Sequence, residues 1–159
     1  GTDVDVILDL MIHDIDIVLK YVPAPVKSVD SVGVPVLSPN ADIANVRIHF
    51  EDGTVANLTA SRVSAKRTRK IRFFQRDAYV SVDYDAGKVQ VFRRVAGTDE
   101  SSHEIVGDER EVGPGDALRT ELEAFVKSVR TREPPEVGGA EGKKALQVAL
   151  RILRKMRSA

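Results

Sequence analysis

The stretch ANVRIHFEDGTVANLTASR, residues 44–62, consists of two alternating runs of apolar and polar residues on either side of a turn. Alternation with a period of two is typical of strands that bury one face, and Asp52-Gly53 is a favoured pair for a tight hairpin turn. The stretch therefore predicts an antiparallel hairpin. Its core-facing residues are Val46, Ile48, Phe50, Ala56, Leu58 and Ala60.

Further strand-like segments lie on both sides of this hairpin and are separated by short turns. Valines mark an extended segment at 29–36, and further segments follow at 71–75, 79–84 and 88–95, with a short one at 104–106. Consecutive strands joined by tight turns form an antiparallel meander. The sequence predicts an open, mainly antiparallel sheet of about six strands.

Three other segments have helical periodicity. The first, 7–19, is mostly apolar and ends before two prolines in Val22-Pro23-Ala24-Pro25. Asp116 is a good N-cap for a second helix, and a third runs from about 140 to 156. A helix, a run of strands and then two helices is the order of an α+β domain, with helices packed on one face of the sheet.

Composition narrows the class of protein. The chain has 159 residues, 42% of them apolar, which suffices for one domain with a core. With 24 basic and 24 acidic side chains, it has no long-range attraction to nucleic acid or to an anionic membrane. Cysteine is absent, and no signal peptide or apolar run of about 20 residues is present. We expect a soluble cytoplasmic domain and, because the chain does not start with methionine, part of a longer protein.

Polar residues form a stripe along the otherwise apolar first helix. At about 100° per residue, Asp9, His13, Asp16 and Lys20 share one side, whereas Asp14 lies away from them. A carboxylate four residues before an imidazole can orient the ring, whose other nitrogen then acts as a general base or acid. A solvated, self-paired stripe explains the same pattern. A metal site is a third reading, but the sequence supplies no second cluster of ligands.

A second candidate is the basic run SRVSAKRTRKIRFFQR, residues 61–76, which also contains two phenylalanines. Phosphate contacts beside stacking rings would suit a nucleic acid, but zero net charge and 5% aromatic residues argue against it. A small anionic ligand, such as a sugar phosphate or nucleotide phosphate, and a solvated face both remain open. The basic residues are Arg62, Lys66, Arg67, Arg69, Lys70, Arg72 and Arg76.

The segment ILDLMIHDID resembles the Asp-x-x-x-His signature that opens the C-terminal domain of the Gfo/Idh/MocA oxidoreductases. VRIHFEDGTVANLTASRV and AYVSVDY resemble the family's hairpin and next strand. ELEAFVKSVRTREPPEVGGAEGKKALQVALRIL resembles its two closing helices. The order and spacing of these pieces extend the resemblance over nearly all of the chain.

This resemblance implies a two-domain enzyme. Residues 1–159 would be the single C-terminal domain for substrate binding and oligomerisation, and a Rossmann domain that binds NAD or NADP would lie upstream. The chain has neither a G-x-G-x-x-G motif nor the family's Glu-Lys-Pro segment. We therefore expect no cofactor-binding or metal-binding residues here and no turnover by this part alone.

The resemblance also implies roles for individual residues. His13 would take the proton from a sugar hydroxyl as hydride leaves the same carbon for nicotinamide, and Asp9 would orient His13 or bind the substrate. Asp16 and Arg62 are further candidates for substrate binding. Within the family, DLMIHDIDIVL, ANLTASRVS and RKIRFFQ are most similar to dehydrogenases of UDP-N-acetylglucosamine.

The expected partners are a sugar or nucleotide sugar and a further copy of the chain, with no nucleic acid and no membrane. Val55, Asn57 and Thr59 point away from the helix-facing side of the sheet, and the resemblance favours a subunit contact there. The alternative function is a non-catalytic binding, scaffold or oligomerisation domain that retains the family's sheet.

Overall fold

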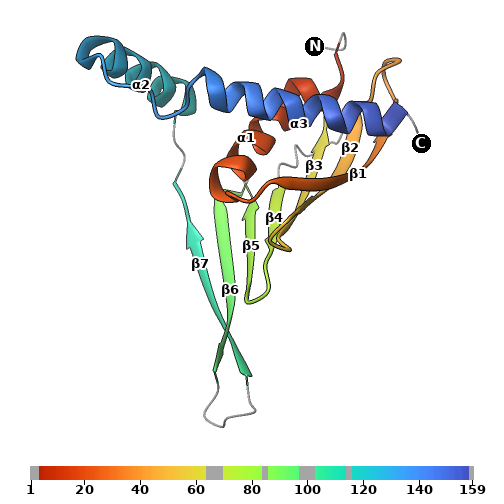
Figure 1. Cartoon of the computed structure of the whole chain (residues 1–159), viewed down its shortest axis with the longest axis vertical. Helices are drawn as coiled ribbons and strands as arrows, with labels where there is room; N and C mark the ends of the chain where they lie inside the picture. The colour runs from red at the N-terminus through yellow and green to blue at the C-terminus, as the bar shows by residue number, and fades with distance from the viewer. Residues whose placement is uncertain (1–3, 64–69, 84–85, 97–102, 114–115, 158–159) are drawn as a thin grey trace.

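The structure, a computed structural model, describes residues 4–63, 70–83, 86–96, 103–113 and 116–157. Its strands pair antiparallel in chain order, which confirms the predicted α+β fold with an open antiparallel sheet (Figure 1). The strands are β1 (Val26–Val34), β2 (Ile43–Phe50), β3 (Val55–Ser61), β4 (Lys70–Phe74), β5 (Ala78–Asp83), β6 (Lys88–Ala96) and β7 (His103–Glu111).

The described part of the sheet has seven strands rather than about six, because β7 is longer than its sequence indicates. The prediction gave only a short strand at 104–106, but β7 pairs with β6 from Ala96↔His103 to Lys88↔Glu111. Every residue of β7 is exposed, so the strand has no buried face and no alternation that would reveal it. Backbone pairing with β6 holds it in place, together with polar contacts from Lys88 and Gln90 to Glu109.

The hairpin at 44–62 forms as predicted. Val46 pairs with Leu58 and Ile48 with Ala56, and these side chains are buried while their neighbours are more exposed. Gly53 has φ of 86°, a conformation that a turn demands and that glycine adopts without strain. β2 and β3 thus form the floor of the core.

The helices are η1, a π-helix at Ile7–Met11, followed directly by α1 (Ile12–Tyr21), then α2 (Ala117–Thr131) and α3 (Gly139–Arg157). The predicted first helix is therefore present, but its first part has the wider π form. Asp116 accepts a hydrogen bond from the Arg119 N–H at 3.0 Å and caps α2 as expected.

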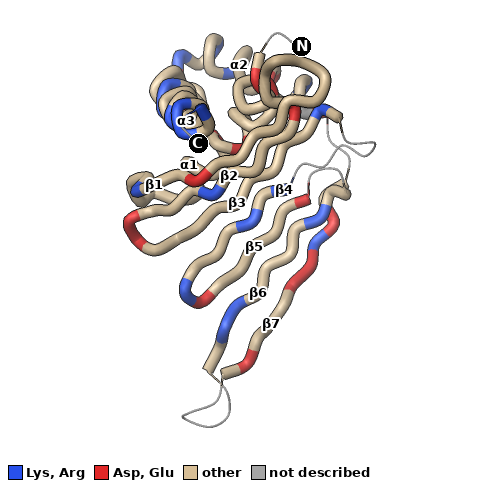
Figure 2. Tube along the Cα trace, turned by 90° about the vertical axis from the view of Figure 1, so that its right-hand side faces the viewer, with Lys and Arg blue, Asp and Glu red and all other residues tan. Residues whose placement is uncertain are grey.

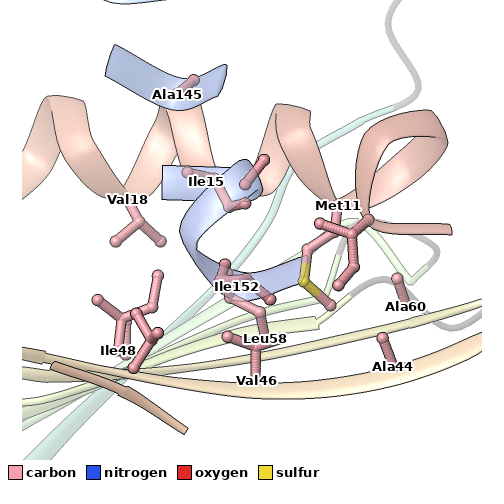
Figure 3. Close-up of a cluster of buried hydrophobic side chains, with 14 of the residues drawn as sticks. Met11, Ile15, Val18, Ala44, Val46, Ile48, Leu58, Ala60, Ala145 and Ile152 are labelled. Atoms are coloured by element: carbon pink, nitrogen blue, oxygen red, sulfur yellow. The ribbon is translucent and has the colours of Figure 1, made fainter. Parts of the chain in front are cut away.

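The core lies between one face of the sheet and the helices α1 and α3. Figure 3 shows Met11, Ile15 and Val18 of the first helical segment and Ile152 of α3 above the residues of β2 and β3. All four of these helical side chains are fully buried. The hairpin of β6 and β7 extends beyond the helices and is mostly exposed (Figures 1 and 2).

Helix α2 departs from the expectation that the helices pack on the sheet. It projects past the edge of the sheet in Figure 1 and has no extensive contact with another element in the described part of the chain. Its apolar side is exposed at Leu118, Leu122, Phe125, Val126 and Val129, by 44–65%. The amphipathic pattern is real, but the described part of the chain provides nothing to cover it.

No helix among the described residues is long and apolar enough to cross a membrane.

Candidate functional site

Helix α1 presents His13 and Asp16 on the side away from the buried core. Because Met11, Ile15 and Val18 face the core, His13 is exposed and Asp9 and Asp16 are half-buried. Asp14 lies among the buried residues, with 1% of its surface exposed, which agrees with its predicted place away from the stripe. π-helical turns are rare in proteins, and many of those that occur lie at functional sites.

His13 and Asp16 line a groove between α1, α2 and the segment that follows α2. The groove has a volume of about 990 Å³. Facing the two α1 residues, α2 contributes Glu121, Phe125 and Lys127. An apolar ring opposite an imidazole and a carboxylate is the mixed lining typical of small-molecule sites.

An ion pair beside the groove links α1 to the segment between α2 and α3. Lys20 at the end of α1 donates to Glu136 Oε1 at 2.5 Å, and Glu136 belongs to the segment between α2 and α3. The hydrogen bond with Glu136 raises the pKa of Lys20, and the same contact lowers the pKa of Glu136. Both groups are exposed, so the pair orients the groove wall and adds little stability.

Asp9 faces a different neighbour from the one the sequence predicts. Its Oδ2 lies 3.6 Å from Arg62 Nη2, and Arg62 Nε lies 3.7 Å from Asp42 Oδ1. Among the described residues, no hydrogen bond joins Asp9 to His13. Asp42 is fully buried, and its pKa is lowered, chiefly by the backbone N–H groups of Val36 and Leu37, although burial acts in the opposite direction.

The structure thus divides the predicted site residues into two groups. His13 and Asp16 share the groove, whereas Asp9 and Arg62 meet at the start of the helix, beside the sheet. Of the basic run, Lys66, Arg67 and Arg69 lie outside the described residues. Lys70 pairs with Asp83 at 2.8 Å, and Arg72 and Arg76 are exposed.

The sequence interpretation missed two contributors to the site. The first is the wall of the groove from α2, since helical periodicity shows that α2 is amphipathic but not where it lies. The second is Asp42, which holds the loop before β2. The clustering of Ser, Pro, Asn and Asp at 38–42 does indicate a turn with side-chain acceptors.

The side chains of the groove include one that can transfer a proton, the imidazole of His13. An exposed imidazole can take up or release a proton near neutral pH, and a nearby carboxylate can bind a hydroxyl group of a ligand. No group of three His, Asp or Glu side chains in the described ranges is arranged to hold a metal ion.

The chain is similar to known proteins over most of its length. The sequence model of the GFO/IDH/MocA C-terminal domain matches residues 3–111. The UDP-N-acetylglucosamine 3-dehydrogenase of Acidithiobacillus ferrooxidans is 36% identical over 150 residues, which are 94% of this chain and 48% of that protein.

Solved structures agree. A crystal form of the A. ferrooxidans UDP-N-acetylglucosamine 3-dehydrogenase superimposes with a TM-score of 0.81 at 35% identity, covering 98% of this chain and 50% of that one. Levoglucosan dehydrogenase in complex with NADH has a TM-score of 0.73 at 14% identity, over 96% of this chain and 48% of that chain, which shows the shared fold. The chain spans about half the length of these relatives.

The family match covers more than half of the chain, and the hairpin and helices that carried the resemblance all form in the structure. The chain belongs to the Gfo/Idh/MocA oxidoreductase family, as its C-terminal domain.

Proposed function

We propose that this chain is the substrate-binding and catalytic domain of an NAD(P)-dependent dehydrogenase that oxidises a hydroxyl of a nucleotide sugar to a ketone. The observation that carries the proposal is the position of His13, exposed in a groove of about 990 Å³ beside Asp16. The substrate class, of the UDP-N-acetylglucosamine type, rests on similarity to a UDP-N-acetylglucosamine 3-dehydrogenase along 94% of the chain.

In the proposed reaction, the sugar carbon loses a hydride and its hydroxyl loses a proton, so that a C=O bond forms. His13 accepts the proton at a ring nitrogen. Asp16 and Asp9 accept hydrogen bonds from sugar hydroxyls and orient the reacting carbon. When nicotinamide is bound, it supplies the acceptor of the hydride.

The groove agrees in size with this assignment, since small-molecule sites typically measure about 300–1,000 Å³. The chain has no G-x-G-x-x-G motif, the turn that typically binds the pyrophosphate of a dinucleotide. We assign the binding of NAD or NADP mainly to a Rossmann domain outside this chain, which would account for the other half of the relatives' length.

The exposed apolar side of α2 is an argument that a further domain covers this helix. Large apolar side chains on one helix, exposed by 44–65%, are unusual unless something covers them. We propose that the cofactor domain is the occupant, since α2 also forms the wall of the groove opposite His13. The backbone amides of α2 should exchange hydrogen more slowly in the complete protein than in the 159-residue chain. Equal rates would contradict this arrangement.

The face of the sheet opposite the helices is the proposed site of oligomerisation, with a second copy of the chain as its occupant. It carries a cluster of Phe74, Tyr79 and Phe92, whose ring centroids are 5.1 and 5.9 Å apart. It also carries charges of both signs, such as Asp30 and Arg47, so two copies can be complementary. Light scattering at high micromolar concentration should show a dimer or tetramer, and a monomer would count against the proposal.

The central experiment is His13→Ala in the complete protein, with His103→Ala as the matched control on the exposed strand β7. Loss of a general base lowers turnover by about 10²- to 10⁴-fold, and cofactor binding should be unchanged. The assay is the absorbance of reduced nicotinamide, first with UDP-N-acetylglucosamine and then with simpler sugars. Unchanged turnover would remove His13 from the mechanism.

The substrate panel separates the remaining possibilities. Reduction with the nucleotide sugar alone would support both the reaction and the substrate class. Reduction with free sugars only would retain the reaction and refute the substrate. No reduction by a protein that binds the cofactor would favour the alternative, a non-catalytic scaffold or oligomerisation domain.

A further inference from the structure

Arg62 joins three separate parts of the chain at the start of the first helix. Its Nη2 donates to the Val4 carbonyl at 2.7 Å and lies 3.6 Å from Asp9 Oδ2, while its Nε lies 3.7 Å from Asp42 Oδ1. Only 11% of the side chain is exposed. We propose that Arg62 is a positioning residue, which sets the place of Asp9 and of the helix that carries His13. This inference rests on the proposed catalytic role of that helix.

Asp42 is the fixed end of this arrangement. Its Oδ2 accepts three backbone hydrogen bonds, from Val36 at 2.8 Å, Leu37 at 2.6 Å and Ser38 at 3.0 Å. Its own backbone accepts from the Arg62 N–H at 3.0 Å. The carboxylate is fully buried and needs a compensating positive charge, which Arg62 supplies. The guanidinium is therefore held from the sheet side and is not free to follow a ligand.

The other end of the arrangement is the segment that leads into the π-helix. Val6 donates to the Ala41 carbonyl at 2.9 Å, and Asp5 Oδ1 accepts from the Ala41 N–H at 2.9 Å. No side chain caps the start of η1. The start of the helix is therefore set by contacts with Ala41 and Arg62, residues distant in sequence, instead of by a local cap.

The chemistry of arginine suits this task. Its planar guanidinium carries five N–H donors in a fixed fork, so that one side chain can serve a carbonyl and two carboxylates together. A lysine at the same place keeps the charge but loses the fork. Asp9 lies about one helical turn before His13, so a shift of Asp9 also displaces the imidazole. Misplacement of a reacting group by about 1 Å can cost 10²-fold in rate.

The test uses the complete protein with Arg62→Met, Arg62→Lys, Asp9→Asn and the double variant Arg62→Met/Asp9→Asn. Arg110→Met on β7 is the control, since Arg110 is exposed and pairs only with Asp108 among the described residues. We expect Arg62→Met to lower kcat by at least about tenfold with less than a threefold change in the KM for UDP-N-acetylglucosamine. Arg62→Lys should recover part of the loss, and Arg62→Met should cost little more once Asp9 is already asparagine.

A second measurement does not depend on turnover. Hydrogen exchange at residues 4–13 should accelerate at least tenfold in Arg62→Met and stay unchanged in Arg110→Met. Unchanged exchange there would overturn the inference even if the substrate is a different one.

Three kinetic results would also overturn it. A raised KM with unchanged kcat would make Arg62 a direct ligand of the substrate. An equal loss of kcat with and without Asp9 would show that Arg62 does not act through Asp9. An unchanged kcat per folded molecule, with a lower melting temperature, would leave only a role in stability. A different experiment tests the proposed function itself: unchanged turnover in His13→Ala would refute that function.

Discussion

Substitution of Ile152 by alanine should lower the free energy of unfolding much more than the same substitution at an exposed position of the same helix. Ile152 lies on α3, is fully buried, and sits between the first helical segment and strands β2 and β3 (Figure 3). Leu150 lies on the same helix with 43% of its surface exposed. The two side chains have the same number of carbon atoms, so the pair compares burial at equal side-chain size.

The expected cost follows from the atoms removed. Ile152→Ala deletes three carbon groups, each worth about 0.8 kcal/mol on burial, which gives about 2.4 kcal/mol. An incompletely filled cavity adds to this, so about 3–4 kcal/mol is expected, within the range of 2–5 kcal/mol typical of such changes. Leu150→Ala should cost about 1 kcal/mol or less, because nearly half of its side chain already meets water.

Urea denaturation followed by circular dichroism measures the difference. With a slope of about 2 kcal/mol per molar urea, Ile152→Ala should lower the midpoint by about 1.5–2 M and Leu150→Ala by about 0.5 M or less. Equal midpoints for the two variants would refute the placement of α3 on the sheet. A change in slope would instead indicate that the denatured state or the two-state behaviour had changed.

Further predictions concern the edges of the core and the ends of the helices. A Cβ on Gly33 would lie 1.8 Å from Met156 Cε and 3.0 Å from Ala41 Cβ; because Cε is the end of a flexible side chain that can move, Gly33→Ala should destabilise the protein by about 1 kcal/mol or less in urea, and Met156→Ala should restore part of the loss. Asp116→Ala removes the N-cap of α2 and should cost about 0.5–2 kcal/mol, seen as faster amide exchange in its first turn. The lowered pKa of Asp42 means that the unfolded state binds the proton more readily, so its contribution to stability is present above about pH 3.8 and is lost as the pH falls through the lower folded value. Asp42→Asn should flatten the loss of stability below pH 4 relative to the native chain, and an unchanged pH dependence would contradict the role of its backbone hydrogen bonds.

The parts of the fold that were predictable are those with a local signal. Val46, Ile48 and Leu58 alternate with polar residues around Asp52-Gly53, and the structure pairs them as a hairpin. Asp116 marks the start of α2 because its side chain accepts from the first turn of that helix. In each case, neighbours in sequence contain the physical cause.

The parts that were not predictable depend on distant contacts. A period of about 100° assumes a regular α-helix, and nothing in ILDLM announces a wider turn. The segment before it is bonded to Ala41 and Arg62, which are 36 and 58 residues away from their partners. β7 was underestimated for a related reason: its wholly exposed residues carry no pattern, and only its pairing with β6 defines it.

The predicted pairing of Asp9 with His13 and the observed pairing with Arg62 are compatible. A carboxylate has two oxygens and about four lone-pair positions, and Arg62 approaches only Oδ2. The side chain of Asp9 is 38% exposed, and Oδ1 has no partner in the described part of the chain, so it remains able to accept from a sugar hydroxyl or from the His13 ring. Arg62 then holds Asp9 in place while the other oxygen meets the ligand. The polar stripe on an apolar helix therefore has two sides, one tied to the sheet through Arg62 and one open to the groove at His13 and Asp16.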